Sequence, residues 1–200
     1  NVIVDQGLKP VFADVDNYSY NLDSKELEKK ITKKTKAIMA VHLFGQPADM
    51  KPIMQIAAKH NLKVIEDSCE TMFVSYDGQK VGSFGDISCF STYVAHLLTS
   101  GVGGLALTNN PDYAVILRSL MNHGRDSIYL SIDDDKDLSK EELTNVVARR
   151  FSFVRPGYSF RVTEMEGALA LAQLEEKDVI LKGRAECAAY YMLQLSQFAN

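Results

Sequence analysis

Short apolar runs bounded by turn residues alternate with segments that repeat an apolar residue every three or four positions. The first kind is typical of buried strands, and the second is typical of helices with one buried face. Asp77-Gly78 also predicts a hairpin turn within 76–81. We therefore expect strands at 2–4, 11–13, 37–41, 63–66, 87–90 and 105–107, and helices at 23–30, 49–60 and 111–123.

The last part of the chain carries a long, intermittent apolar pattern from Thr163 to about Phe198. This pattern predicts a helix that bends near Gly183. Upstream of it, the alternation of strands and helices predicts an α/β fold, with a mostly parallel sheet between two layers of helices. In such folds chemistry gathers at the carboxyl ends of the strands. Because the chain starts abruptly in an apolar run, we expect it to be part of a longer protein.

The composition is ordinary for a globular protein, with 46% hydrophobic and 24% charged residues. The net charge is -4 and lysines are mixed with acids, so no basic stripe marks a nucleic-acid partner. No apolar run reaches the roughly 18 residues that a membrane-spanning helix needs. Residues 1–9 lack the features of a signal peptide. A cytoplasmic location is therefore the expectation.

Polar side chains follow two of the expected strands. Asp67 comes at the end of the strand at 63–66, where a carboxylate either serves a site or simply caps the next turn. Ser91 follows the strand at 87–90, a position where serine is usually a turn residue. His96 lies in an apolar stretch, where histidine serves either as a buried structural residue or as an acid-base group. His42 and His123 lie near the ends of predicted elements, where a histidine is usually structural. The alternative is that they line the site.

Residues 89–104 read Cys-Phe-Ser-Thr-Tyr-Val-Ala-His-Leu-Leu-Thr-Ser-Gly-Val-Gly-Gly. This segment resembles the coenzyme-lysine loop of the DegT/DnrJ/EryC1/StrS sugar aminotransferases, in which a Phe-Ser-aromatic stretch precedes the lysine that binds pyridoxal phosphate. The resemblance implies that 1–160 form part of a coenzyme-binding large domain of the aspartate-aminotransferase-like fold, called fold type I. It also implies that 161–200 form a long helix leading towards a smaller C-terminal domain. Further motifs follow in family order at 10–16, 36–45, 64–67, 85–86, 122–124 and 157–164.

The same resemblance implies roles for individual residues. Asp67 pairs with the pyridine nitrogen of the coenzyme, and Ser91 bonds its phosphate. Glu70 and Ser159 are further cofactor-binding positions. Two departures stand out, because Ser159 replaces a common asparagine and Val102 replaces a usual glutamate.

His96 occupies the position of the coenzyme lysine. An imidazole moves protons near neutral pH, but it cannot form a Schiff base with an aldehyde. The sequence therefore resembles the branch of coenzyme-dependent 3-dehydratases in deoxysugar biosynthesis. This implies a homodimer that uses pyridoxamine or pyridoxal phosphate to remove the C3 hydroxyl of a nucleotide-linked 4-keto-6-deoxy sugar. His96 is then the acid-base catalyst, and glutamate is the amino donor that regenerates the coenzyme.

Cysteine spacing separates two kinds of enzyme within this branch. One kind also binds an iron-sulfur cluster, through one cysteine after the Glu-Asp motif and three more downstream. Cys69 matches the first, but the only cysteine after Cys89 is Cys187, so no cluster is expected and the thiols should be free. Two alternatives stay open. One is a sugar aminotransferase in which Lys80 or Lys136 serves, and the other is a non-catalytic descendant that binds a sugar nucleotide or a partner subunit.

Overall fold

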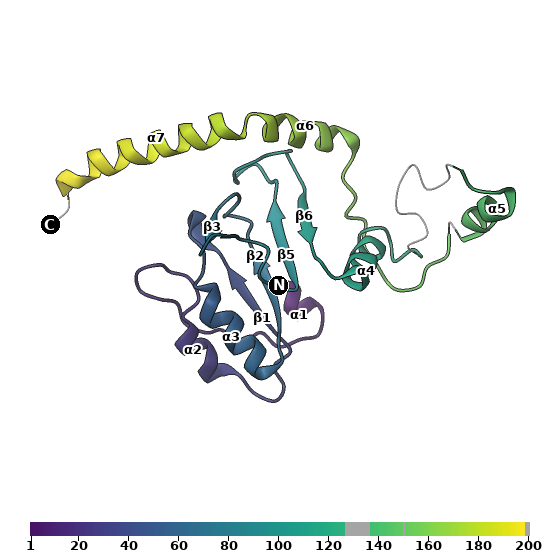
Figure 1. The fold of residues 1–200 in the computed structure, drawn as a ribbon, viewed down its shortest axis with the longest axis horizontal. Coiled ribbons are helices and arrows are strands. Elements are labelled where there is room, and N and C mark those ends of the chain that lie inside the picture. Colours follow the sequence, from purple (N-terminus) through teal and green to yellow (C-terminus); the bar gives the residue numbers. More distant parts are fainter. Residues whose placement is uncertain (127–136, 150, 199–200) are drawn as a thin grey trace.

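The computed structural model describes residues 1–126, 137–149 and 151–198 (Figure 1). Its strands are β1 (Ala37–Val41), β2 (Lys63–Asp67), β3 (Ser75–Tyr76), β4 (Gln79–Lys80), β5 (Ile87–Ser91) and β6 (Gly104–Leu107). Its α-helices are α1 (Val2–Asp5), α2 (Ser24–Lys30), α3 (Met50–His60), α4 (Pro111–Met121), α5 (Lys140–Arg149), α6 (Glu164–Glu175) and α7 (Lys177–Leu195). Short 3-10 turns, η1 (Leu43–Gly45) and η2 (Ser196–Phe198), complete the described elements.

The main sheet has the strand order β1-β2-β5-β6. β1 pairs with β2, and β2 with β5, in parallel, whereas β6 runs antiparallel to β5. β3 and β4 form the separate hairpin expected around Asp77-Gly78. The mostly parallel sheet and its strand positions from residue 37 onward confirm the predicted α/β class, and β6 is the antiparallel exception.

The hydrophobic core lies between one face of this sheet and the helices α2 and α3. Alternate residues of the strands, such as Ile38 and Val64, point into it and pack with Met50 and Ile53 of α3. Burying an isoleucine or methionine side chain contributes about 1.5–3 kcal/mol. On the opposite face, Met39 and Val41 of β1 are exposed whereas the side chains of β2 and β5 are partly buried at their carboxyl ends, and that face carries the residues discussed below.

Side chains at the helix ends explain where several helices begin and stop. The carboxylate of Asp23 accepts a hydrogen bond from the Lys25 amide at 2.7 Å and so caps α2. Asn110 caps α4 in the same way ahead of Pro111, whose ring suits a first helical position. Asn61 ends α3 in the left-handed conformation. These helices confirm the predicted ones at 23–30, 49–60 and 111–123 to within two residues at each end.

Two expected strands near the amino terminus are wrong. Residues 2–4 lie in the single helical turn α1, and residues 11–13 form no regular element. The side chains of Val11 and Phe12 are 62% and 85% exposed. An apolar run becomes a strand only when a neighbouring strand pairs with it, and here none does within the described residues.

The expected long helix at the carboxyl end is two helices. The Glu166 side chain accepts a hydrogen bond from the Thr163 amide at 2.7 Å at the start of α6. The break falls at Glu176 and not at Gly183, which lies inside α7. Figure 1 shows α6 and α7 running end to end past the sheet. Among the described helices, none combines the length and the apolar composition needed to cross a bilayer.

Candidate active site

The ends of β2 and β5 bring Asp67 and Ser91 to the same face of the sheet. The register pairs Asp67 with Cys89, and Ser91 lies two residues further along, so all three share the face opposite α3. An Asp67 carboxylate oxygen accepts from the Cys69 amide at 3.2 Å, and the Ser91 hydroxyl accepts from the Tyr93 amide at 3.1 Å. Asp67 and Ser91 are both only partly buried, so each remains accessible to a ligand.

Glu66, the first of the two carboxylates at the end of β2, has a different role. It faces the core, is fully buried, and accepts from the amides of Gly82, Phe84 and Gly85 at 2.8, 2.8 and 2.6 Å. Burial alone raises the pKa of a carboxyl. Here the hydrogen bonds from an imidazole and from these three amides outweigh burial and hold the pKa of Glu66 below its ordinary value. Glu66 is structural, which leaves the second carboxylate for chemistry.

The imidazole on Glu66 belongs to His42, which is also fully buried. Nδ1 of His42 accepts from the Ala48 amide at 2.9 Å. In the neutral ring Nε2 must then carry the proton, and it donates to Glu66 at 3.2 Å. Both nitrogens of His42 are used, which confirms the prediction that it is structural.

His96 lies on the loop of residues 92–103, between β5 and β6. The base of this loop is closed by the Thr92 amide donating to Gly103, at 3.1 Å, and by the Ser100 amide donating to Thr92, at 2.9 Å. The two hydroxyls of Thr92 and Ser100 also bond each other at 2.8 Å. A Cβ on Gly104 would lie 2.7 Å from the backbone oxygen of Phe90, so this close strand approach requires glycine. The glycine cluster thus shapes the loop that presents His96.

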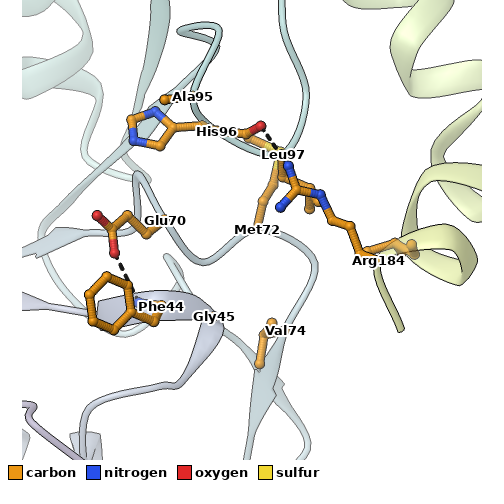
Figure 2. A pocket seen from close by; sticks show the side chains of 10 residues that line it. Phe44, Gly45, Glu70, Met72, Val74, Ala95, His96, Leu97 and Arg184 are labelled. Carbon is orange, nitrogen blue, oxygen red and sulfur yellow. Dashed lines mark hydrogen bonds between the residues drawn. The ribbon is translucent and has the colours of Figure 1, made fainter. Parts of the chain in front are cut away.

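A cavity of about 480 Å³ lies beside this loop. Its walls come from η1, from the segment after β2, from the His96 loop and from α7. Figure 2 shows His96 and Glu70 towards one side of the cavity and Arg184 of α7 on the other. The Glu70 carboxylate accepts from the amide of Phe44, at 2.9 Å, and Phe44 holds a positive φ of 53°. Glu70 therefore fixes the position of an exposed aromatic ring at the cavity wall.

The ring nitrogens of His96 differ from those of His42. Within the described part of the chain, Nδ1 of His96 is buried and has no hydrogen-bond partner. A buried polar atom without a partner is costly, and such atoms are characteristic of sites that bind or react. The backbone of His96 is held, because its amide donates to Tyr93 at 2.9 Å and its carbonyl accepts from Arg184 at 3.0 Å. The side chain is therefore available for chemistry, whereas its main chain is fixed.

The structure groups only some of the predicted site residues. His96 and Glu70 line the same cavity, whereas Asp67 and Ser91 belong to the neighbouring sheet face and do not line it. Ser159 is exposed, and its hydroxyl accepts from Arg161 at 3.2 Å. It pairs with Asn122 in a β-bridge, and neither residue lines the cavity.

Among the cavity-lining residues that the sequence did not assign to the site are Phe44 and Arg184. The segment containing Phe44 was noted as a family motif, without a role. Arg184 follows His96 by 88 residues and carries no local signal.

Two cysteines, Cys69 and Cys89, lie beside Asp67, and the pKa of each thiol is raised, so neither thiol is activated. Cys69 and Cys89 are partly buried, and no disulfide joins the three cysteines, as predicted. Burial, followed by the neighbouring Asp67 carboxylate, raises the pKa of Cys69 to about 12. Within the residues that the structure describes, no group of His, Cys, Asp and Glu side chains is arranged to hold a metal ion.

No lysine lines the cavity in the described residues. Lys80, one of the two alternatives to His96, donates to the Phe73 carbonyl at 3.4 Å on the exposed side of the hairpin. Lys136, the other alternative, falls outside the described residues. His96, which the resemblance places at the coenzyme-lysine position, lines the cavity.

A mostly parallel sheet with an aspartate and a serine at its strand ends, followed by the loop that carries His96, is typical of a fold-type I, aminotransferase-like protein. Solved structures of this class share the fold. The model of the DegT/DnrJ/EryC1/StrS aminotransferase family matches residues 1–200. The chain therefore belongs to that family, a family of enzymes.

Relatives within the family carry out more than one reaction. A GDP-perosamine synthase of Caulobacter vibrioides is 38% identical over 194 residues, which cover 97% of this chain and 47% of the relative. A dTDP-4-dehydro-2,6-dideoxy-D-glucose 3-dehydratase of Saccharopolyspora spinosa is 35% identical over 181 residues, 88% of this chain and 39% of the relative. The first name describes a synthase of an amino sugar and the second a dehydratase.

A solved structure of a GDP-4-keto-6-deoxy-D-mannose-3-dehydratase from E. coli, with bound hydrated PLP, is similar to the whole fold. Its TM-score is 0.82 at 27% identity, and the match covers 97% of this chain and 49% of that one. The chain spans about half the length of the curated relatives it matches.

Proposed function

We propose that this chain belongs to a pyridoxamine or pyridoxal phosphate-dependent 3-dehydratase that acts on a nucleotide-linked 4-keto-6-deoxy sugar. One observation carries the proposal. His96 stands at the coenzyme-lysine position of the family, faces a cavity, and keeps a buried Nδ1 without a partner in the described residues. A lysine there would bind the coenzyme covalently, whereas histidine leaves proton transfer as the chemistry of this position.

The residues present suit the cofactor. Asp67 offers a carboxylate to a pyridine nitrogen, and Ser91, on the same sheet face, offers a hydroxyl to a phosphate. Glu70 lines the cavity with His96, and we propose it as a further contact for the coenzyme. Ser159 is the weakest member of the set, because its hydroxyl is exposed and bonded to Arg161. We assign it to the cofactor only by its motif position.

When bound, pyridoxamine phosphate supplies an amine that condenses with a keto group and a ring that accepts electrons. The Asp67 carboxylate would hold the ring nitrogen in its protonated form. His96 would accept a proton as a base and then donate that proton to the C3 hydroxyl, which would leave as water. One histidine thus serves as base and then as acid.

Solved relatives support the nucleotide-sugar substrate and the amino donor. One structure of a GDP-4-keto-6-deoxymannose-3-dehydratase holds GDP-perosamine, and another holds a trapped adduct of PLP and glutamate. We propose the same classes of ligand here, a nucleotide-linked sugar and glutamate. We also propose a homodimer, because apolar side chains of α6 and α7, such as Leu169 and Leu193, are 56% and 70% exposed.

A sugar aminotransferase is the second candidate. GDP-perosamine synthases at 38% and 37% identity favour it. The cavity opposes it, since no lysine lines it within the described ranges and Lys80 bonds elsewhere. We therefore place dehydration first.

Product analysis of the full-length natural protein distinguishes the two candidates. The protein is incubated with pyridoxamine phosphate and a GDP- or dTDP-linked 4-keto-6-deoxy sugar, and products are identified by mass spectrometry and NMR. We expect a keto sugar without its C3 hydroxyl, and we expect H96N to abolish its formation. An amino sugar that keeps the C3 hydroxyl would refute the proposal.

A further inference from the structure

We propose that Arg184 of α7 is a positioning residue that fixes the loop carrying His96. The inference rests on the function proposed for His96, but the contact itself is a property of the chain. The Arg184 guanidinium donates from Nη2 to the His96 carbonyl at 3.0 Å (Figure 2). A guanidinium donor makes a stronger hydrogen bond than a neutral one.

The loop needs such an anchor because the hydrogen bonds that join its two ends lie at its base, away from His96. Thr92, Ser100 and Gly103 bond one another there. Nearer the tip, the backbone contacts are local, with the His96 amide donating to the Tyr93 carbonyl at 2.9 Å. Arg184 is the one side chain from a distant element that bonds the loop tip among the described residues. It therefore limits how far the backbone at His96 can shift.

The face of α7 that carries Arg184 also forms a wall of the cavity. Leu181, one helical turn earlier, lines it together with Arg184. A second cationic contact holds the start of the same helix, since Lys177 Nζ lies 5.7 Å from the centre of the Phe73 ring. Phe73 lies between Met72 and Val74, which line the cavity as well. The position of α7 and the orientation of His96 are therefore coupled.

The test compares R184Q with R184K and with K182Q as a matched control. Lys182 lies on the same helix, is exposed, and contacts only Glu186, at 3.8 Å, among the described residues. In the coenzyme-free, full-length protein, mass spectrometry follows acylation of His96 by diethyl pyrocarbonate. Hydrogen exchange follows the amides of residues 93–99. Equal Tm values verify that each variant is folded.

We expect R184Q to speed the modification of His96 roughly fivefold, the factor expected for losing one net hydrogen bond. Hydrogen exchange of the amides at residues 93–99 should also become faster in R184Q. R184K should keep part of the protection against acylation and exchange, and K182Q should match wild type. R184Q indistinguishable from K182Q in both readouts would overturn the proposal. Neither acylation nor hydrogen exchange requires turnover. The role of Arg184 can therefore be tested even if the protein shows no dehydratase activity. If turnover is present, R184Q should lower kcat more than it changes KM.

Discussion

The buried carboxylate of Glu66 gives the sharpest stability prediction. Oε1 accepts from the amides of Phe84 and Gly85, and Oε2 accepts from the Gly82 amide and from Nε2 of His42. In E66Q a side-chain NH₂ group replaces either Oε1 or Oε2. Because each oxygen accepts two hydrogen bonds, two donors lose their acceptor whichever way the amide is turned. Each buried donor left without an acceptor costs about 1–3 kcal/mol. Allowing for local relaxation, the loss in the free energy of unfolding is about 2–5 kcal/mol.

Urea unfolding at pH 7, followed by circular dichroism, measures this loss. D67N is the matched control, because Asp67 is the next residue and is partly exposed. Among the described residues its carboxylate accepts only from the Cys69 amide, which an asparagine oxygen can still satisfy. We expect D67N to unfold within about 0.5 kcal/mol of wild type, as is usual for exposed substitutions. An E66Q variant as stable as D67N would refute the structural role assigned to Glu66.

Three further predictions concern pH, packing and thiols. The pKa of Glu66 lies below its ordinary value of 4.5, so the ionised carboxylate stabilises the fold above that pH, and this stabilisation is lost as the pH falls through the lowered pKa. The free energy of unfolding should therefore fall less steeply with decreasing pH in E66Q than in wild type. Identical slopes would contradict this. G104A places a Cβ 2.7 Å from the Phe90 backbone oxygen and should lower the free energy of unfolding in urea by about 1–3 kcal/mol. G167A on α6, where a Cβ would meet no atom within 4 Å, should raise it by up to about 1 kcal/mol. Equal effects would exclude the close approach of the strands at Gly104. Iodoacetamide at pH 8 should label the exposed Cys187 before Cys69, because burial raises the pKa of Cys69 to about 12. Peptide mapping that finds Cys69 labelled first would contradict the burial of Cys69.

Strands and helices were predictable where the sequence carried both periodicity and a boundary signal. Asp23 and Pro111 mark helix starts that the structure confirms. The apolar run at 2–4 gave a wrong strand because burial depends on a partner that periodicity does not reveal. The break at Glu176 also lacked a signal, while Gly183 proved compatible with an uninterrupted helix.

For the site, the motif order located His96, but its surroundings required the fold. The two adjacent carboxylates of β2 look equivalent in sequence, yet strand alternation sends Glu66 into the core and leaves Asp67 on the open face. Arg184 reaches His96 only because α7 returns past the loop. Contacts of this kind are set by tertiary packing.

The role of His96 is tested most directly by placing a lysine at this position. Full-length wild type and H96K are incubated with pyridoxal phosphate, reduced with borohydride, and digested for peptide mapping. We predict that H96K carries the reduced coenzyme covalently at residue 96 and that wild type carries none on any lysine. Coenzyme attached to a lysine of the wild-type protein would contradict the proposal and favour an aminotransferase.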